Sequence, residues 1–200
     1  MKGTKAFAAL FALLLAGTPA FAATAAPQGD VFSRVTARSF TGKALPLATL
    51  RTLTAAAFSA PTAVDQRSLE FFWVTDRGVL GRLKTASPYA TALDTAPAVL
   101  VICANMRDTR IADLVAFDAG AAAEAVLAEA AHLGLHSVPM SLAPVKGRIE
   151  GSQKALGLSR DIVPQIMVAV GEKAPDAVSG ASAKRHDPAR VHLNTWKNGL

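Results

Sequence analysis

Three runs of apolar residues predict buried β-strands. They are Leu69–Thr75, Ala98–Ala104 and Ile162–Val170, and valine, isoleucine and phenylalanine dominate them. A shorter stretch, His136–Met140, is a further strand candidate. Pro139 lacks a backbone N–H, so we expect it to confine that strand to a sheet edge or to cut it short.

Apolar residues at helical spacing separate these runs. In the predicted helix Leu47–Phe58, the side chains of Leu47, Leu50, Leu53 and Ala57 fall on one side. Two further helices, Asp118–Leu133 and Lys146–Leu156, each end before a glycine. Shorter helices are expected at Val31–Arg38 and around Leu80–Thr85, the latter after a turn at Asp76-Arg77-Gly78. Strands that alternate with helices and are apolar on both faces indicate a sheet covered by helices on both sides.

The first 22 residues have the pattern of a cleavable signal peptide. Lys2 and Lys5 precede an apolar run from Ala6 to Ala16, and Ala20-Phe21-Ala22 supplies the small residues of a cleavage site. A membrane anchor is the alternative, but the run is about half the roughly 20 residues that a bilayer needs. We therefore expect a periplasmic or secreted protein without an anchor, in which residues 23–30 form a flexible lead and residues 31–200 a single domain.

The chain is basic, with a formal net charge of +6. No basic run is interleaved with aromatic residues, so nucleic-acid binding is not expected. Basic residues around a small anionic ligand explain the charge more economically. The single cysteine, Cys103, lies in an apolar run and is expected to be a buried structural thiol.

Motifs for side-chain catalysis are missing from the sequence. It contains neither a G-x-S-x-G turn nor a G-x-G-x-x-G loop after a strand. His132 and His136 are four residues apart, but Gly134 between them disfavours a shared helix face, so we expect no metal site. A set of spaced polar residues remains: Arg34, Thr36 and Arg38 near the start, and Lys184 and Arg185 near the end. From charge alone, a solvated basic surface is the favoured interpretation of these residues.

Six separated segments, in order, resemble the FMN-dependent nitroreductase family. Residues 34–41 are similar to its opening R-x-S-x-R/K-x-F motif, and residues 60–71 to its A-P-S-x-x-N-x-Q-P-W-x-F loop and first strand. Residues 88–101 resemble the next strand and the segment that precedes it, and residues 118–135 resemble the central helix. Residues 162–171 resemble a strand that ends in glycine, and residues 191–196 resemble the closing V-H-x-N-x-W motif.

The resemblance implies an α+β nitroreductase-like fold, with a mixed central sheet flanked by helices on both faces. It further implies a homodimer that binds FMN at the subunit interface. Carried over by position, the cofactor-binding residues would be Arg34, Thr36, Arg38, Asp65, Lys184 and Arg185. The flavin would carry the chemistry, so no catalytic side chain is required.

The sequence departs from the family pattern at several flavin-facing positions. Asp65 replaces an asparagine, Arg67-Ser68-Leu69 replaces Q-P-W, Pro139-Met140-Ser141 replaces W-x-G, and Glu172-Lys173 replaces Y-P. Two functions therefore stay open. One is an exported FMN oxidoreductase that passes electrons from a small-molecule donor to a small aromatic or quinone-like acceptor. The alternative is a non-catalytic, dimeric flavin-binding or degenerate family member.

Overall fold

The computed structural model describes residues 30–177, 179–181 and 187–196. The predicted signal peptide, almost all of the predicted flexible lead, and both Lys184 and Arg185 lie outside these residues. The helices are α1 (Asp30–Ser33), α2 (Leu47–Ser59), α3 (Arg77–Thr85), α4 (Val115–His132) and α5 (Lys146–Leu156). The strands are β1 (Val35–Ala37), β2 (Leu69–Val74), β3 (Ala98–Asn105), β4 (His136–Ser141), β5 (Ile162–Gly171) and β6 (Ser179–Ala181).

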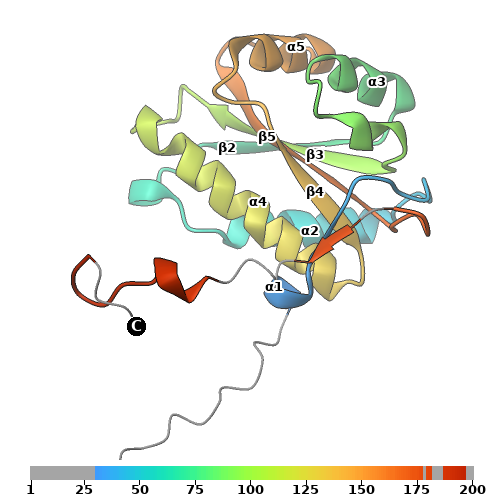
Figure 1. The fold of residues 1–200 in the computed structure, drawn as a ribbon. Helices are drawn as coiled ribbons and strands as arrows, with labels where there is room; N and C mark the ends of the chain where they lie inside the picture. The colour runs from blue at the N-terminus through green and yellow to red at the C-terminus, as the bar shows by residue number, and fades with distance from the viewer. Residues whose placement is uncertain (1–29, 178, 182–186, 197–200) are drawn as a thin grey trace, which may run out of the picture.

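The strands form one mixed sheet in the order β2-β3-β5-β4-β1-β6. Neighbouring strands are antiparallel except β1 and β4, which are parallel through the pair Thr36 and Ser137. Strand β3 is the best protected: its first seven residues, Ala98–Ala104, are buried. The sheet is covered on both faces, which confirms the predicted fold class (Figure 1).

Alternate residues of the central strands face two separate hydrophobic cores. On one face, Val99 and Val101 of β3 pack in a core with Leu80 and Leu83 of α3 and with Ala155 of α5. On the other face, Leu100 and Ile102 share a core with Leu53 of α2 and with Val126 and Leu127 of α4. The two helical layers therefore stabilise the sheet independently of each other.

The alanines of α4 serve the chain's own core. Ala119, Ala122, Ala123 and Ala130 are buried in the core between α4, α2 and the sheet. Small side chains let the helix lie close to its neighbours. These four alanines are therefore covered within one chain.

The predicted helix Val31–Arg38 is confirmed only as far as Ser33 and is wrong beyond it. Helix α1 ends at Ser33, and residues 35–37 form β1, which hydrogen-bonds to β4 and to β6. The β-branched Val35 and Thr36 favour a strand once partner strands are present. Pairing with residues 100 or more positions away decides this segment, and no local pattern reveals such pairing.

Two further local predictions, a turn at Asp76-Arg77-Gly78 and the effect of Pro139 on its strand, differ from the structure. The expected turn at Asp76-Arg77-Gly78 is the start of α3, where Asp76 Oδ1 accepts a hydrogen bond from the Val79 N–H at 2.8 Å as an N-cap. The expectation that Pro139 confines its strand to a sheet edge or cuts it short is wrong, because β4 continues past Pro139 to Ser141 and lies between β5 and β1. However, β1 pairs with β4 only at Ser137, so β4 has no described neighbour on that side at Pro139.

The other helices and strands that the sequence predicts agree with its pattern, whereas β6 has no predicted counterpart. Helix α5 has the predicted bounds, and Gly157 ends it with a φ of 66°. Helix α2 buries Leu50, Leu53 and Ala57 as expected, while Leu47 at its first turn stays exposed. Within the described ranges, no helix is long and apolar enough to span a bilayer.

Candidate functional site

Arg34 and Thr36 lie at the end of the sheet formed by β1 and β6. The Arg34 side chain is 14% exposed, and its Nε lies 3.4 Å from Glu124 Oε1 on α4. This buried Nε makes no hydrogen bond to any described residue, although the ion pair is close. Thr36 is the middle residue of β1, between Ser137 of β4 and Gly180 of β6. Arg34 thus offers a buried donor that an anionic ligand could use.

Arg38 follows the end of β1 and lines a small hollow of about 230 Å³. The hollow is also lined by Pro88, Tyr89, Val138 and Pro139. Three segments singled out by the sequence, around residues 34–41, 88–90 and 139–141, therefore meet at one place.

Tyr89 in this hollow is held by a second basic residue. The Arg148 guanidinium of α5 lies 4.9 Å from the centre of the Tyr89 ring, a cation–π contact. Tyr89 is nevertheless 69% exposed. Arg38 and the exposed ring of Tyr89 give the hollow a positive, partly aromatic character, which suits a planar anion.

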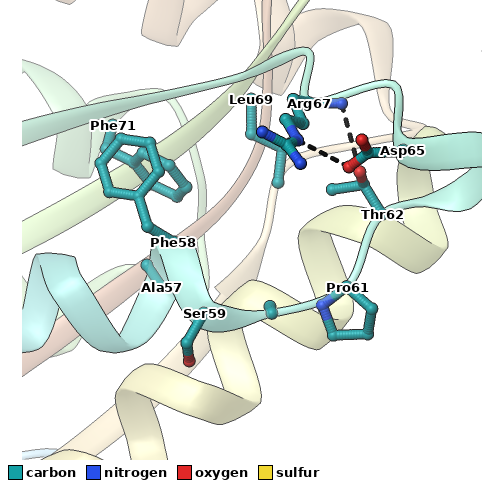
Figure 2. Close-up of a pocket in the computed structure, with 10 residues that line it drawn as sticks. Ala57, Phe58, Ser59, Pro61, Thr62, Asp65, Arg67, Leu69 and Phe71 are labelled. Carbon is teal, nitrogen blue, oxygen red and sulfur yellow. Dashed lines mark hydrogen bonds and ion pairs between the residues drawn. The ribbon is translucent and has the colours of Figure 1, made fainter.

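Asp65 belongs to a different part of the surface. It lies in the loop between α2 and β2, and its Oδ1 accepts a hydrogen bond from Arg67 Nε at 2.6 Å (Figure 2). This hydrogen bond and the charge of Asp65 raise the pKa of Arg67. The side chains are 69% and 77% exposed. Asp65 therefore points to solvent beside Arg67 within one chain.

The loop of Asp65 borders a wider hollow of about 540 Å³. Its apolar wall contains Phe58 of α2 and Phe71 of β2, whose rings meet edge to face at 4.8 Å and 66°. Figure 2 shows these rings at one side of the hollow, with Thr62, Asp65 and Arg67 at the other.

The structure thus divides the predicted site residues into two groups. Arg34, Thr36 and Arg38 follow β1, whereas Asp65 precedes β2, and β3, β5 and β4 lie between these strands. Four strand spacings amount to about 19 Å across the sheet. Lys184 and Arg185 lie outside the described residues, between Asp187 and Ala181 of β6, and Ala181 pairs with Val35 next to Arg34.

Two buried polar residues of the Asp65 loop region were missed by the sequence analysis. Gln66 and Asp118 are 6% and 3% exposed, and Asp118 Oδ2 accepts a hydrogen bond from Gln66 Nε2 at 2.6 Å. A signal for Asp118 exists in the sequence. It begins a row at four-residue spacing that continues with Ala122, Val126 and Ala130, so a carboxylate falls on the buried face of α4.

Other candidate chemistry finds little support in the described residues. His132 ends α4 and His136 starts β4, so the two histidines belong to different elements. No group of three metal-ligating side chains occurs in the described ranges. Cys103 is buried as predicted, and burial, with a smaller effect of the charge of Glu70, raises the pKa of its thiol to about 12. The thiol is therefore a poor nucleophile near neutral pH.

Comparison with known proteins gives one consistent result. The model of the nitroreductase family matches residues 82–172. A protein of Methanothermobacter thermautotrophicus, provisionally named an NADH dehydrogenase/NAD(P)H nitroreductase, is 25% identical over 164 residues, which are 82% of this chain and 84% of that protein.

Solved structures share the fold over most of the chain. A provisionally named NADH oxidase from Clostridium acetobutylicum superposes with a TM-score of 0.78 at 29% identity, covering 84% of this chain and 99% of the other. A provisionally named nitroreductase from Desulfovibrio desulfuricans, solved in complex with FMN, gives a TM-score of 0.70 at 19% identity over 83% of this chain and 94% of its own. The family model, the curated relative and the solved structures agree that the chain is similar to the nitroreductase family.

Proposed function

We propose that this protein is an exported FMN-dependent oxidoreductase of nitroreductase type that reduces a small aromatic or quinone-like acceptor. The observation that carries the proposal is the meeting of Arg38, Tyr89 and Pro139 at one hollow beside β1. These residues come from three separate segments that resemble the family. The names of the relatives, which mention NADH, NAD(P)H and nitroreductase, support an oxidoreductase.

The chemistry of the residues along β1 fits FMN. A phosphate group favours charge-assisted hydrogen bonds from arginine. The buried Nε of Arg34 has no hydrogen-bond partner among the described residues, and such a donor gains most from an anionic acceptor. Lys184 and Arg185 follow Ala181 by three and four residues, at most about 11 and 14 Å of extended chain, and in this proposal both would approach the same phosphate.

When bound, FMN would supply the hydride chemistry, and the side chains would bind and orient it. Arg34 would hold the phosphate, and Thr36 would offer a hydroxyl to the ribityl chain. Arg38 would place a positive charge near the pyrimidine side of the flavin, where it would stabilise the negative charge gained on reduction. No side-chain nucleophile is then required, which agrees with the buried, high-pKa thiol of Cys103.

We further propose that the complete site belongs to a homodimer. Asp65 and the β1 residues lie at opposite parts of the sheet, so one flavin can meet both groups only if a second subunit brings its own Asp65 loop. Phe58 and Phe117, which are 69% and 73% exposed, provide apolar surface for such an interface. Light scattering of the flavin-loaded protein tests this assembly, and a monomer at micromolar concentration with flavin bound would contradict it.

Export and the electron donor are connected in this proposal. The pattern of the first 22 residues supports export, and N-terminal sequencing of the exported fraction should find a mature chain that begins at Ala23. NAD(P)H is scarce outside the cytoplasm, so a different small-molecule donor would have to reach the flavin there. Finding Met1 retained in the exported fraction would argue against processing.

A turnover experiment tests the oxidoreductase function. Purified protein loaded with FMN is mixed anaerobically with dithionite or NADH and then with a quinone, while the flavin absorbance is followed. The proposal predicts that the flavin is reduced and then reoxidised in repeated cycles. A protein that binds FMN but never transfers electrons to any acceptor supports the non-catalytic alternative instead.

A further inference from the structure

The loop that carries Asp65 has an unusual backbone. Val64, Asp65 and Arg67 have φ values of 47°, 52° and 47°, in the left-handed region that non-glycine residues rarely adopt. For the β-branched Val64 this conformation is especially unfavourable. Such a conformation persists only where surrounding contacts determine it. The question is therefore which contacts hold these residues in place.

A closed set of hydrogen bonds surrounds the loop. Asp118, in the first turn of α4, accepts from the Ala63 N–H at 2.8 Å through Oδ1 and from Gln66 Nε2 at 2.6 Å through Oδ2. Gln66 Oε1 accepts from the backbone N–H groups of Arg110 and Ile111, both at 3.1 Å. The loop is thus tied to α4 and to the segment after β3.

Two further features reinforce these ties. The Arg110 side chain returns to the loop and donates a hydrogen bond to the Val64 carbonyl, next to the strained residues. The N-terminal turn of a helix favours a negative charge, which stabilises the Asp118 carboxylate in its buried position. The carboxylate and the amide side chain are both buried, so each would be costly to leave without its partner.

We propose that Asp118 and Gln66 are positioning residues that lock residues 61–67 into a preformed part of the binding site. Among the described residues, neither side chain hydrogen-bonds to Asp65 or Thr62, but the two fix the backbone that presents both of those side chains. The part of this proposal that concerns ligand binding rests on the proposed FMN function. The locking itself does not depend on flavin.

The orientation of the two side chains allows a strict test. The N–H groups of Arg110 and Ile111 can only donate, so Gln66 must present its oxygen to them and its Nε2 to Asp118. In Asp118→Asn, the new amide accepts from Ala63 through its oxygen and then points its NH₂ group at Gln66 Nε2. No orientation of the two amides satisfies every donor, although the size of the side chain is unchanged.

The exchange of donor and acceptor should repair this defect. Gln66→Glu alone places two carboxylates against each other at the 2.6 Å contact. In the double variant, the new amide at position 118 donates to the new carboxylate at position 66, which still accepts from Arg110 and Ile111. The two single variants should therefore be impaired and the double variant restored, which is a double-mutant cycle with rescue.

Limited trypsin digestion of the flavin-free protein measures the locking directly. The exposed Arg67 precedes the buried Ser68, so cleavage between them requires the loop to open. We expect the Arg67 cleavage rate, normalised to cleavage at the exposed Arg160, to rise roughly tenfold in Asp118→Asn and Gln66→Glu and to return toward wild type in the double variant. Equal cleavage in all four proteins would overturn the locking.

FMN titration of the same proteins measures the effect on binding. We expect FMN affinity to fall roughly tenfold in the single variants and to recover in the double variant. Thr54→Val is the matched control. It removes the 2.8 Å hydrogen bond that Trp73 Nε1 of β2 donates to Thr54 of α2, and it leaves the hydrogen bonds of Asp118 and Gln66 intact. It should lower stability and leave both readouts unchanged.

The outcomes separate this proposal from the proposed function. Faster Arg67 cleavage with unchanged FMN affinity would show that the loop is locked but takes no part in binding, which overturns the positioning role. A wild-type protein that binds no FMN would contradict the proposed function, and the digestion would still decide whether Asp118 and Gln66 hold the loop.

Discussion

The centre of the sheet and its two sides are built on different principles. The interior strand β3 buries Ala98–Ala104 and carries no charged side chain in that run. At one side, Arg34 keeps a buried Nε without a hydrogen bond to described residues, and at the other, Val64 and Asp65 adopt left-handed backbone conformations. Residues that raise the cost of folding are thus concentrated where binding is proposed, while the centre supplies stability.

The largest expected effect comes from the centre. Ile102→Ala removes a fully buried side chain from the core between β3, α2 and α4, and should lower the free energy of unfolding by about 2–5 kcal/mol. FMN affinity of the folded fraction should not change. Urea denaturation measures the stability and FMN titration of the same preparation measures the affinity. A large loss of FMN affinity at unchanged stability would contradict the assignment of stability to the interior of the sheet and of binding to its sides.

Arg34→Ala should have the opposite profile. We expect it to weaken FMN binding by about 1.5–3 kcal/mol, the range for a charge-assisted hydrogen bond. Its effect on stability should stay within about 1 kcal/mol, because the Glu124 partner is 48% exposed and can be hydrated. Arg185→Ala should weaken binding in a more salt-sensitive way if that side chain is nearer to solvent. Unchanged affinity in Arg34→Ala would mean that Arg34 is only a structural cation.

Asp65→Asn tests whether the two sides meet at one flavin. Loss of a negative charge near the flavin should raise its midpoint potential, by on the order of 30 mV for a two-electron couple if the interaction is worth about 1.4 kcal/mol. Arg67→Gln is the matched control of opposite sign, since it leaves Asp65 without its 2.6 Å partner and should lower the potential. Equal midpoint potentials in all three proteins would show that neither side chain senses the flavin.

The smallest expected effect is a pH dependence of stability at His136. Burial, and secondarily the charge of Lys173, lower the pKa of His136 below its ordinary value of 6.5. Below that value the unfolded chain binds more protons than the folded protein, so the free energy of unfolding decreases as the pH falls from 7 toward 5. His136→Asn should show a shallower decrease over this window. Identical pH profiles would contradict the contribution of His136.

The same division explains what the sequence could predict. Helix α5 and strands β3 and β5 follow from apolar runs and a terminal glycine, because each is decided by its own residues. Strand β1 is only three residues long and is stabilised by β4 and β6, so a local pattern suggested a helix there.

The candidate site was predictable only in part. The resemblance identified the segments of Arg38, Tyr89 and Pro139, and the structure brings them together. It did not reveal that Asp65 lies across the sheet from β1, and the pairing of Asp65 with Arg67 depends on the loop conformation. That conformation depends in turn on Gln66 and Asp118, which are 52 residues apart in the chain.

The most direct test of the central claim is the flavin content of the protein purified from its natural compartment. The visible absorption spectrum, together with titration of the stripped protein by FMN, measures whether the β1 side of the sheet binds the cofactor. The account predicts a yellow protein that rebinds FMN to saturation at one flavin per chain, with weaker binding in Arg34→Ala. A colourless wild-type protein that gives no response to added FMN would contradict it.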